Sequence, residues 1–87
     1  MTKGGRDTKR EMKDLVVDAR GLLCPLPILR LARALRHCPA GTVALLYATD
    51  PAAVGDVDVF CREEGHELLS AEREGNLLLF RVRKAES

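Results

Sequence analysis

Residues 21–27 read Gly-Leu-Leu-Cys-Pro-Leu-Pro and place a single cysteine directly before two prolines. The first amide groups of a helix have no intrahelical acceptor, so prolines fit a first helical turn without loss of a hydrogen bond. Pro25 and Pro27 therefore predict the start of a helix, and Gly21 would supply an unusual backbone angle in the turn before it. Cys24 is expected to be extended and at or near the N-cap, because proline disfavours a helical predecessor.

This position predicts a reactive thiol. The sulfur of Cys24 would face unpaired backbone amides and the positive end of the helix dipole, and both favour the thiolate. Helix N-termini lower the pKa of a cysteine from its usual value of about 8.5. We therefore expect Cys24 to be largely nucleophilic near neutral pH.

Strands are expected on both sides of this helix. Residues 15–19 are rich in β-branched side chains and end at Arg-Gly, whereas residues 42–48 form the nearly continuous apolar run of a buried strand. Between them, apolar residues recur at the spacing of one helical face, up to a stop near residues 37–41. These apolar residues are Ile28, Leu31, Ala32 and Leu35. A strand, a helix and a strand in this order predict a right-handed parallel unit.

The second half of the chain predicts another helix and a hairpin. The Thr-Asp-Pro sequence at 49–51 is typical of a helix start, with aspartate as the cap, and Gly65 would close that helix. Residues 66–72 and 77–84 flank Glu-Gly-Asn at 74–76 and predict a β-hairpin. The last strand is expected to direct Leu78, Phe80 and Val82 to one side. The order is βαβαββ, an α+β fold in which two helices cover one face of a four-stranded mixed sheet as a two-layer α/β sandwich.

Composition limits the domain count and the class of partner. The 87 residues suffice for one domain, which we place at residues 14–85. Residues 1–13 hold five basic and two acidic side chains, so their net charge is +3, whereas the net charge of the remaining residues is −2. This composition predicts a disordered basic tail. One tyrosine, two phenylalanines and no tryptophan make direct nucleic-acid binding unexpected. No apolar run approaches the roughly 20 residues of a membrane span, and no signal segment is visible, so we expect a cytoplasmic protein.

The cysteine count argues against several kinds of site. Three cysteines at spacings of 14 and 23 residues fit neither a disulfide framework nor the paired ligands of a structural zinc site. No metal and no cofactor are expected. Such a set of thiols suits a reducing compartment.

Several motifs occur together in a fixed order: Asp-Ala-Arg-Gly-Leu-Leu-Cys-Pro-Leu-Pro at 18–27, Asp-Pro-Ala at 50–52, Cys61, and Gly-His at 65–66. Together they resemble the TusA/SirA-like family of sulfur-carrier proteins over roughly residues 15–84. The fold of that family, two helices over a four-stranded sheet, agrees with the elements predicted above. One departure is that Asp58 stands where many relatives have a proline.

The resemblance implies that Cys24 accepts a sulfane sulfur as a persulfide and passes it to a cysteine of a partner protein. The donor would be a cysteine desulfurase or a rhodanese-like protein, and the acceptor would serve tRNA thiolation, cofactor assembly or sulfur oxidation. The chain would act as a sulfurtransferase-like carrier by transpersulfidation rather than as a stand-alone enzyme. In each step a thiolate attacks the outer sulfur of a persulfide, and the other cysteine leaves.

The other candidate residues have structural or partner-binding interpretations. Arg20, Arg30 and Arg33 are candidates for contact with an acidic partner. Asp50 is interpreted as a helix cap that could also belong to the partner surface. Leu77 and Leu79, if exposed, would offer the open sheet face for a weak homodimer. Structural positions are expected for Cys38, Cys61 and His66.

Two alternatives to sulfur carriage stay open. A regulatory or adaptor domain that binds protein or nucleic acid would use Cys24 only structurally. A thiol peroxidase or redox sensor would use it chemically, but the sequence lacks a Cys-x-x-Cys pair and an obvious resolving cysteine.

Overall fold

The computed structural model describes residues 15–85, so the predicted tail at residues 1–13 lies outside the described residues. Within them the chain forms the six predicted elements in the predicted order. These are β1 (Leu15–Ala19), α2 (Leu26–Arg36), β2 (Val43–Ala48), α3 (Ala53–Glu64), β3 (Glu67–Glu74) and β4 (Leu77–Arg83). The α+β class and the βαβαββ order are confirmed.

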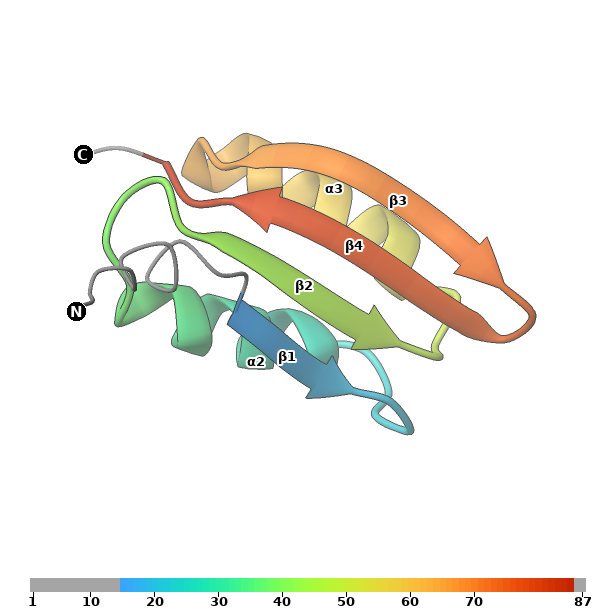
Figure 1. The fold of residues 1–87 in the computed structure, drawn as a ribbon. Helices are drawn as coiled ribbons and strands as arrows, with labels where there is room; N and C mark the ends of the chain where they lie inside the picture. The colour runs from blue at the N-terminus through green and yellow to red at the C-terminus, as the bar shows by residue number, and fades with distance from the viewer. Residues whose placement is uncertain (1–14, 86–87) are drawn as a thin grey trace, which may run out of the picture.

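The strands form one mixed sheet in the order β1-β2-β4-β3, and both helices cover the same face of it (Figure 1). β1 pairs with β2 in parallel, with Ala19 opposite Ala48, whereas the β2–β4 and β4–β3 pairs are antiparallel. Because β1 and β2 run in the same direction, the loops that follow them meet at one end of the sheet (Figure 1). That end carries Cys24.

The core lies between the sheet and the helices. Leu31 and Leu35 on α2, and Val57 and Cys61 on α3, are spaced by one helical turn and are all buried. Each fully buried aliphatic side chain of this size contributes about 1.5–3 kcal/mol through removal of apolar surface from water. The predicted alternation of β4 is confirmed, since its buried residues are Leu78, Phe80 and Val82.

The start of α2 agrees with the prediction that Cys24 lies at or near the cap, whereas α3 begins later than the sequence predicted. Pro25 is the N-cap of α2, so Cys24 lies one residue before the cap. For α3 the predicted cap was Asp50, but the N-cap is Ala52 and the residues between them form a turn closed by the Ala53 amide on the Asp50 carbonyl at 2.9 Å. The carboxylate of Asp50 is engaged by two backbone amides, described below, instead of capping a helix that starts at the next residue.

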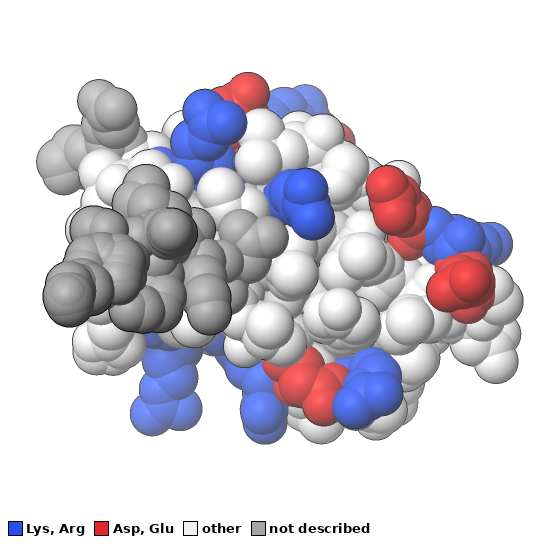
Figure 2. Space-filling view, viewed as in Figure 1, with Lys and Arg blue, Asp and Glu red and all other residues white. Residues whose placement is uncertain are grey.

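No helix of the described residues covers the second face of the sheet, which faces the viewer in Figure 2, where residues other than Lys, Arg, Asp and Glu occupy most of the middle. Val16 on β1 is 61% exposed there, and Leu45, Tyr47 and Leu79 are half-buried. Leu77 at the start of β4 is likewise half-buried. A weak homodimer through this face stays a prediction.

Candidate functional site

Three free cysteines occupy very different environments. Cys24 is exposed in the loop between β1 and α2, directly before the N-cap of the helix. Cys61 is only 3% exposed, and burial raises its pKa to about 11. Cys38 is half-buried, and its thiol donates to the Ala34 carbonyl oxygen at 3.3 Å. Cys24 is therefore the thiol that a second protein can reach.

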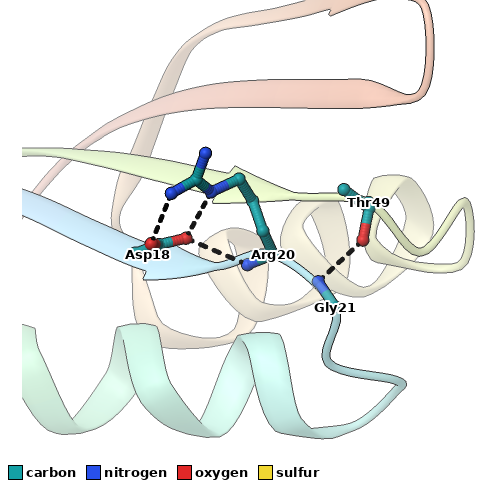
Figure 3. A network of polar contacts seen from close by, with 4 residues as sticks. All are labelled: Asp18, Arg20, Gly21 and Thr49. Carbon is teal, nitrogen blue, oxygen red and sulfur yellow. Dashed lines mark hydrogen bonds and ion pairs between the residues drawn. The ribbon is translucent and has the colours of Figure 1, made fainter.

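Hydrogen bonds from backbone amides hold the loop around Cys24 in place. Gly21 has a φ of 81°, the left-handed region that glycine adopts without steric cost, as the sequence predicted. Its amide donates to the Thr49 hydroxyl oxygen at 2.9 Å, which joins the loop after β1 to the end of β2 (Figure 3). The Leu26 amide donates to the Leu23 carbonyl at 2.8 Å and closes a turn around Cys24. The peptide bond between Cys24 and Pro25 is cis.

Asp50 links this loop to the segment that precedes α3. One carboxylate oxygen accepts the Cys24 amide at 2.7 Å, and the other accepts the Ala52 amide at 3.1 Å. These two bonds, the first above all, lower the pKa of Asp50. The carboxylate thus fixes the backbone of Cys24, a role more specific than the predicted cap.

The thiol itself contacts Asp56 in the first turn of α3. The Cys24 Sγ donates to Asp56 Oδ2, with 2.7 Å between the two atoms. This hydrogen bond raises the pKa of Cys24, and some desolvation and the negative charges of Asp56 and Asp50 act in the same direction. The sequence predicted a lowered pKa, and that prediction is wrong for the free chain. The Asp56 carboxylate accepts the thiol hydrogen directly and Asp50 adds a second negative charge, whereas Cys24 lies outside the first helical turn, where the helix dipole acts most strongly.

A shallow groove of about 280 Å³ lies beside the thiol, between α2 and α3. Besides Cys24 and Asp56, its lining includes Ile28 from α2 and Phe60 from α3. Unusually exposed apolar side chains occur on the two helices and the loop before α2. They are Leu23 at 69%, Leu29 at 56%, Leu26 and Val54 at 48% each, and Val59 at 45%. An exposed sulfur in a partly apolar surface suits docking of a protein better than enclosure of a small substrate.

None of the three predicted arginines lines the groove beside the sulfur. Arg20 binds Asp18 through two side-chain bonds of 2.9 Å each and points away from α2 (Figure 3). This pairing holds the pKa of Asp18 at about 2. Arg30 and Arg33 are exposed on α2 and line a second depression with three leucines. Their role in partner contact stays a prediction.

His66 has a structural environment. Its Nδ1 accepts the amide of Ala85 at 2.9 Å, and its ring lies 5.2 Å from that of Phe60. Burial lowers the pKa of His66, which favours the neutral ring that this hydrogen bond needs.

The described residues hold neither a metal-binding cluster nor a membrane-spanning helix. Across residues 15–85, histidine, cysteine and acidic side chains form no group of three that could hold a metal ion. Neither α2 nor α3 has the length and apolar character to cross a membrane.

Asp56 and Thr49 were not identified as site residues from the sequence. A topological signal was available, because the carboxyl ends of two adjacent parallel strands lie at the same edge of a sheet. Residues just after β2 must therefore approach residues just after β1. Polar side chains at 49–56 were the candidates for contact with Cys24.

Comparison with known proteins places this arrangement in a family. Residues 15–84 match the family model described as sulfurtransferase TusA. The chain belongs to the TusA family. It is 42% identical over 72 residues to the sulfur carrier protein TusA of Allochromatium vinosum, covering 83% of this chain and 95% of that one. It is 46% identical over 63 residues to a putative sulfur carrier protein of Neisseria meningitidis serogroup A, covering 72% and 85%.

The TusA assignment agrees with a solved structure. A SirA-like protein from Desulfitobacterium hafniense superposes with a TM-score of 0.71 over 83% of this chain and 99% of that chain. Identity is 19%, so this similarity supports the fold alone. The predicted resemblance to TusA/SirA-like proteins is confirmed. Membership of a sulfur-carrier family implies protein donors and acceptors of sulfur.

Proposed function

We propose that this chain is a sulfur carrier in which Cys24 receives a sulfane sulfur as a persulfide and delivers it to a cysteine of another protein. The observation that carries the proposal is the placement of the exposed thiol in the Cys-Pro-Leu-Pro turn of a TusA-family chain. Relatives named sulfur carriers, at 38% to 46% identity, support the same role.

The chemistry is two successive exchanges of one sulfur atom. The thiolate of Cys24 attacks the outer sulfur of a donor persulfide, and the donor cysteine leaves; an acceptor thiolate then attacks the outer sulfur on Cys24. The site needs to be open for both steps. The protein is therefore a sulfurtransferase-like carrier that depends on its partners, in a compartment we expect to be the cytoplasm.

The helical layer offers two surfaces of opposite charge for these partners. α2 carries arginines at 30, 33 and 36 and no acidic residue, whereas α3 carries acidic residues at 56, 58, 63 and 64 and a single arginine. Complementary charge increases the rate of encounter and discriminates against wrong partners. We expect a cysteine desulfurase or rhodanese-like donor and a separate acceptor to contact overlapping parts of this layer around Cys24.

The test is loading by a cysteine desulfurase supplied with cysteine, followed by intact mass. Wild type should gain the mass of one sulfur atom, and Cys24→Ser should gain none. Cys38→Ser is the matched control and should load normally. Failure of wild type to gain sulfur from several desulfurases and rhodanese-like donors would refute the proposal, and full cellular activity of Cys24→Ser would favour an adaptor role.

A further inference from the structure

The contact between Asp56 and the thiol joins two segments 32 residues apart in the chain. Ala53 and Val57 are almost completely buried and fix the rotation of α3 about its axis. Asp56 consequently lines the groove beside Cys24. It belongs to the first turn of α3, where the helix dipole stabilises negative charge. The fold thus holds a carboxylate against the sulfur.

The charged groups that line the groove or bind the backbone of Cys24 are acidic. Asp56 and Glu63 line the groove from α3, and Asp50 approaches from the preceding loop. On the opposite wall the lining residues Pro25 and Ile28 carry no charge. The arginines at 30 and 33 line the separate depression on α2. The groove therefore favours the uncharged form of a thiol placed in it.

We propose that Asp56 gates sulfur transfer: its carboxylate holds Cys24 as a hydrogen-bonded thiol until a positively charged side chain of the sulfur-donor protein pairs with that carboxylate. This inference rests on the carrier function proposed above. In the free carrier the thiol donates to Asp56, which suppresses the nucleophilic thiolate and protects the cysteine from alkylation and oxidation. A donor lysine or arginine at the groove pairs with the carboxylate and removes the largest cause of that suppression.

The transfer step balances without net oxidation. When the cation pairs with Asp56, the thiol proton leaves to solvent and Sγ of Cys24 becomes a thiolate. It attacks the outer sulfur of the donor's protonated persulfide, so that one S–S bond forms on Cys24 while the donor's S–S bond breaks. The donor cysteine leaves as a thiolate and takes up a proton from solvent. One sulfur atom has moved from the donor cysteine to Cys24. The acidic groove favours a basic surface on the donor protein.

The test starts from the pH profile of Cys24 alkylation by iodoacetamide, followed by peptide mass spectrometry on the free protein. Asp56→Asn removes the charge and keeps the size, so the profile should move to lower pH and the rate at neutral pH should rise several-fold. Asp58→Asn is the matched control. It removes a carboxylate from the same helix, but Asp58 is paired with Arg62 at 2.9 Å and does not line the groove. Its profile should equal that of wild type.

A second measurement compares loading from glutathione persulfide with loading from a desulfurase supplied with cysteine. Asp56→Asn should load from glutathione persulfide faster than wild type does. The ratio of the loading rate from the desulfurase to the loading rate from glutathione persulfide should therefore be smaller in Asp56→Asn than in wild type. An alkylation profile unchanged by Asp56→Asn would overturn the gate even if Cys24 carries sulfur normally. A shifted profile in a protein that no donor can load would instead refute the carrier function. If this ratio of loading rates is the same in wild type and in Asp56→Asn, the inference that the donor surface is basic is overturned.

Discussion

Gly21 and Gly55 provide a matched pair of glycine substitutions with opposite expected signs. A Cβ atom added at either position would meet no atom within 4 Å, so steric contact does not distinguish them. Gly21 has a φ of 81°, whereas Gly55 is inside α3. Alanine in the left-handed region costs about 1–2 kcal/mol. Alanine in place of a helical glycine contributes about 0.5–1 kcal/mol.

We therefore expect Gly21→Ala to lower the free energy of unfolding by about 1–2 kcal/mol and Gly55→Ala to raise it by about 0.5–1 kcal/mol. For a small domain, 1 kcal/mol corresponds to a melting shift of about 4–8 °C. Urea unfolding followed by circular dichroism measures both, and the m-value should not change. Gly21→Asn should lose less than the alanine variant, because asparagine tolerates this conformation better.

Two results would contradict these expectations: a Gly21→Ala variant as stable as wild type, or an equal loss of stability in both alanine variants. The first result would mean that the turn before Cys24 relaxes to a negative φ without cost. The second would mean that α3 requires the absence of a side chain at position 55, and that this requirement outweighs the gain in backbone entropy.

Arg20→Gln should raise the pKa of Asp18 from about 2 toward 3.8 in a carboxyl-carbon NMR titration, and no change would show that the ion pair does not form in solution. Because the lowered pKa of Asp18 stabilises the fold above pH 3.8 and is lost as pH falls toward 2, this variant should also be less sensitive to acid. Cys61, 3% exposed, should be alkylated in the native protein only through unfolding, so its labelling rate should rise with urea in step with the unfolded fraction; fast native labelling would contradict its burial. His66 has a lowered pKa, so its contribution to stability is present above pH 6.5 and is lost as pH falls through the folded pKa. Thermal melts of wild type between about pH 7 and 5 should show this loss, and His66→Asn, which lacks the titrating ring, should show less of it.

The elements could be predicted from the sequence because their signals are local. The prolines at 25 and 27 indicate a helix start, and the alternation in β4 indicates which of its side chains are buried. Gly21 and Gly65 were expected at a turn and a helix end, and both have positive φ. Each of these features depends on residues within a few positions of one another.

The protonation of Cys24 could not be predicted in the same way, because its causes are distant in the chain. The local sequence contains the helix start and no nearby carboxylate to oppose it. Asp50 and Asp56 reach the cysteine only through the parallel pairing of β1 and β2. The start of α3 was missed for a related reason, because one oxygen of the Asp50 carboxylate binds the amide of Cys24, a residue distant in the chain.

The parallel pairing of β1 and β2 makes the site a property of the folded chain. A fragment that ended after β2 would keep the whole Cys-Pro-Leu-Pro turn and lose both carboxylates that act on it. Its cysteine would have neither of these carboxylates beside it, as in an unfolded peptide. In the complete domain, the segment that supplies the sulfur and the segment that restrains it meet only after the sheet has formed, so folding itself sets the chemical state of Cys24.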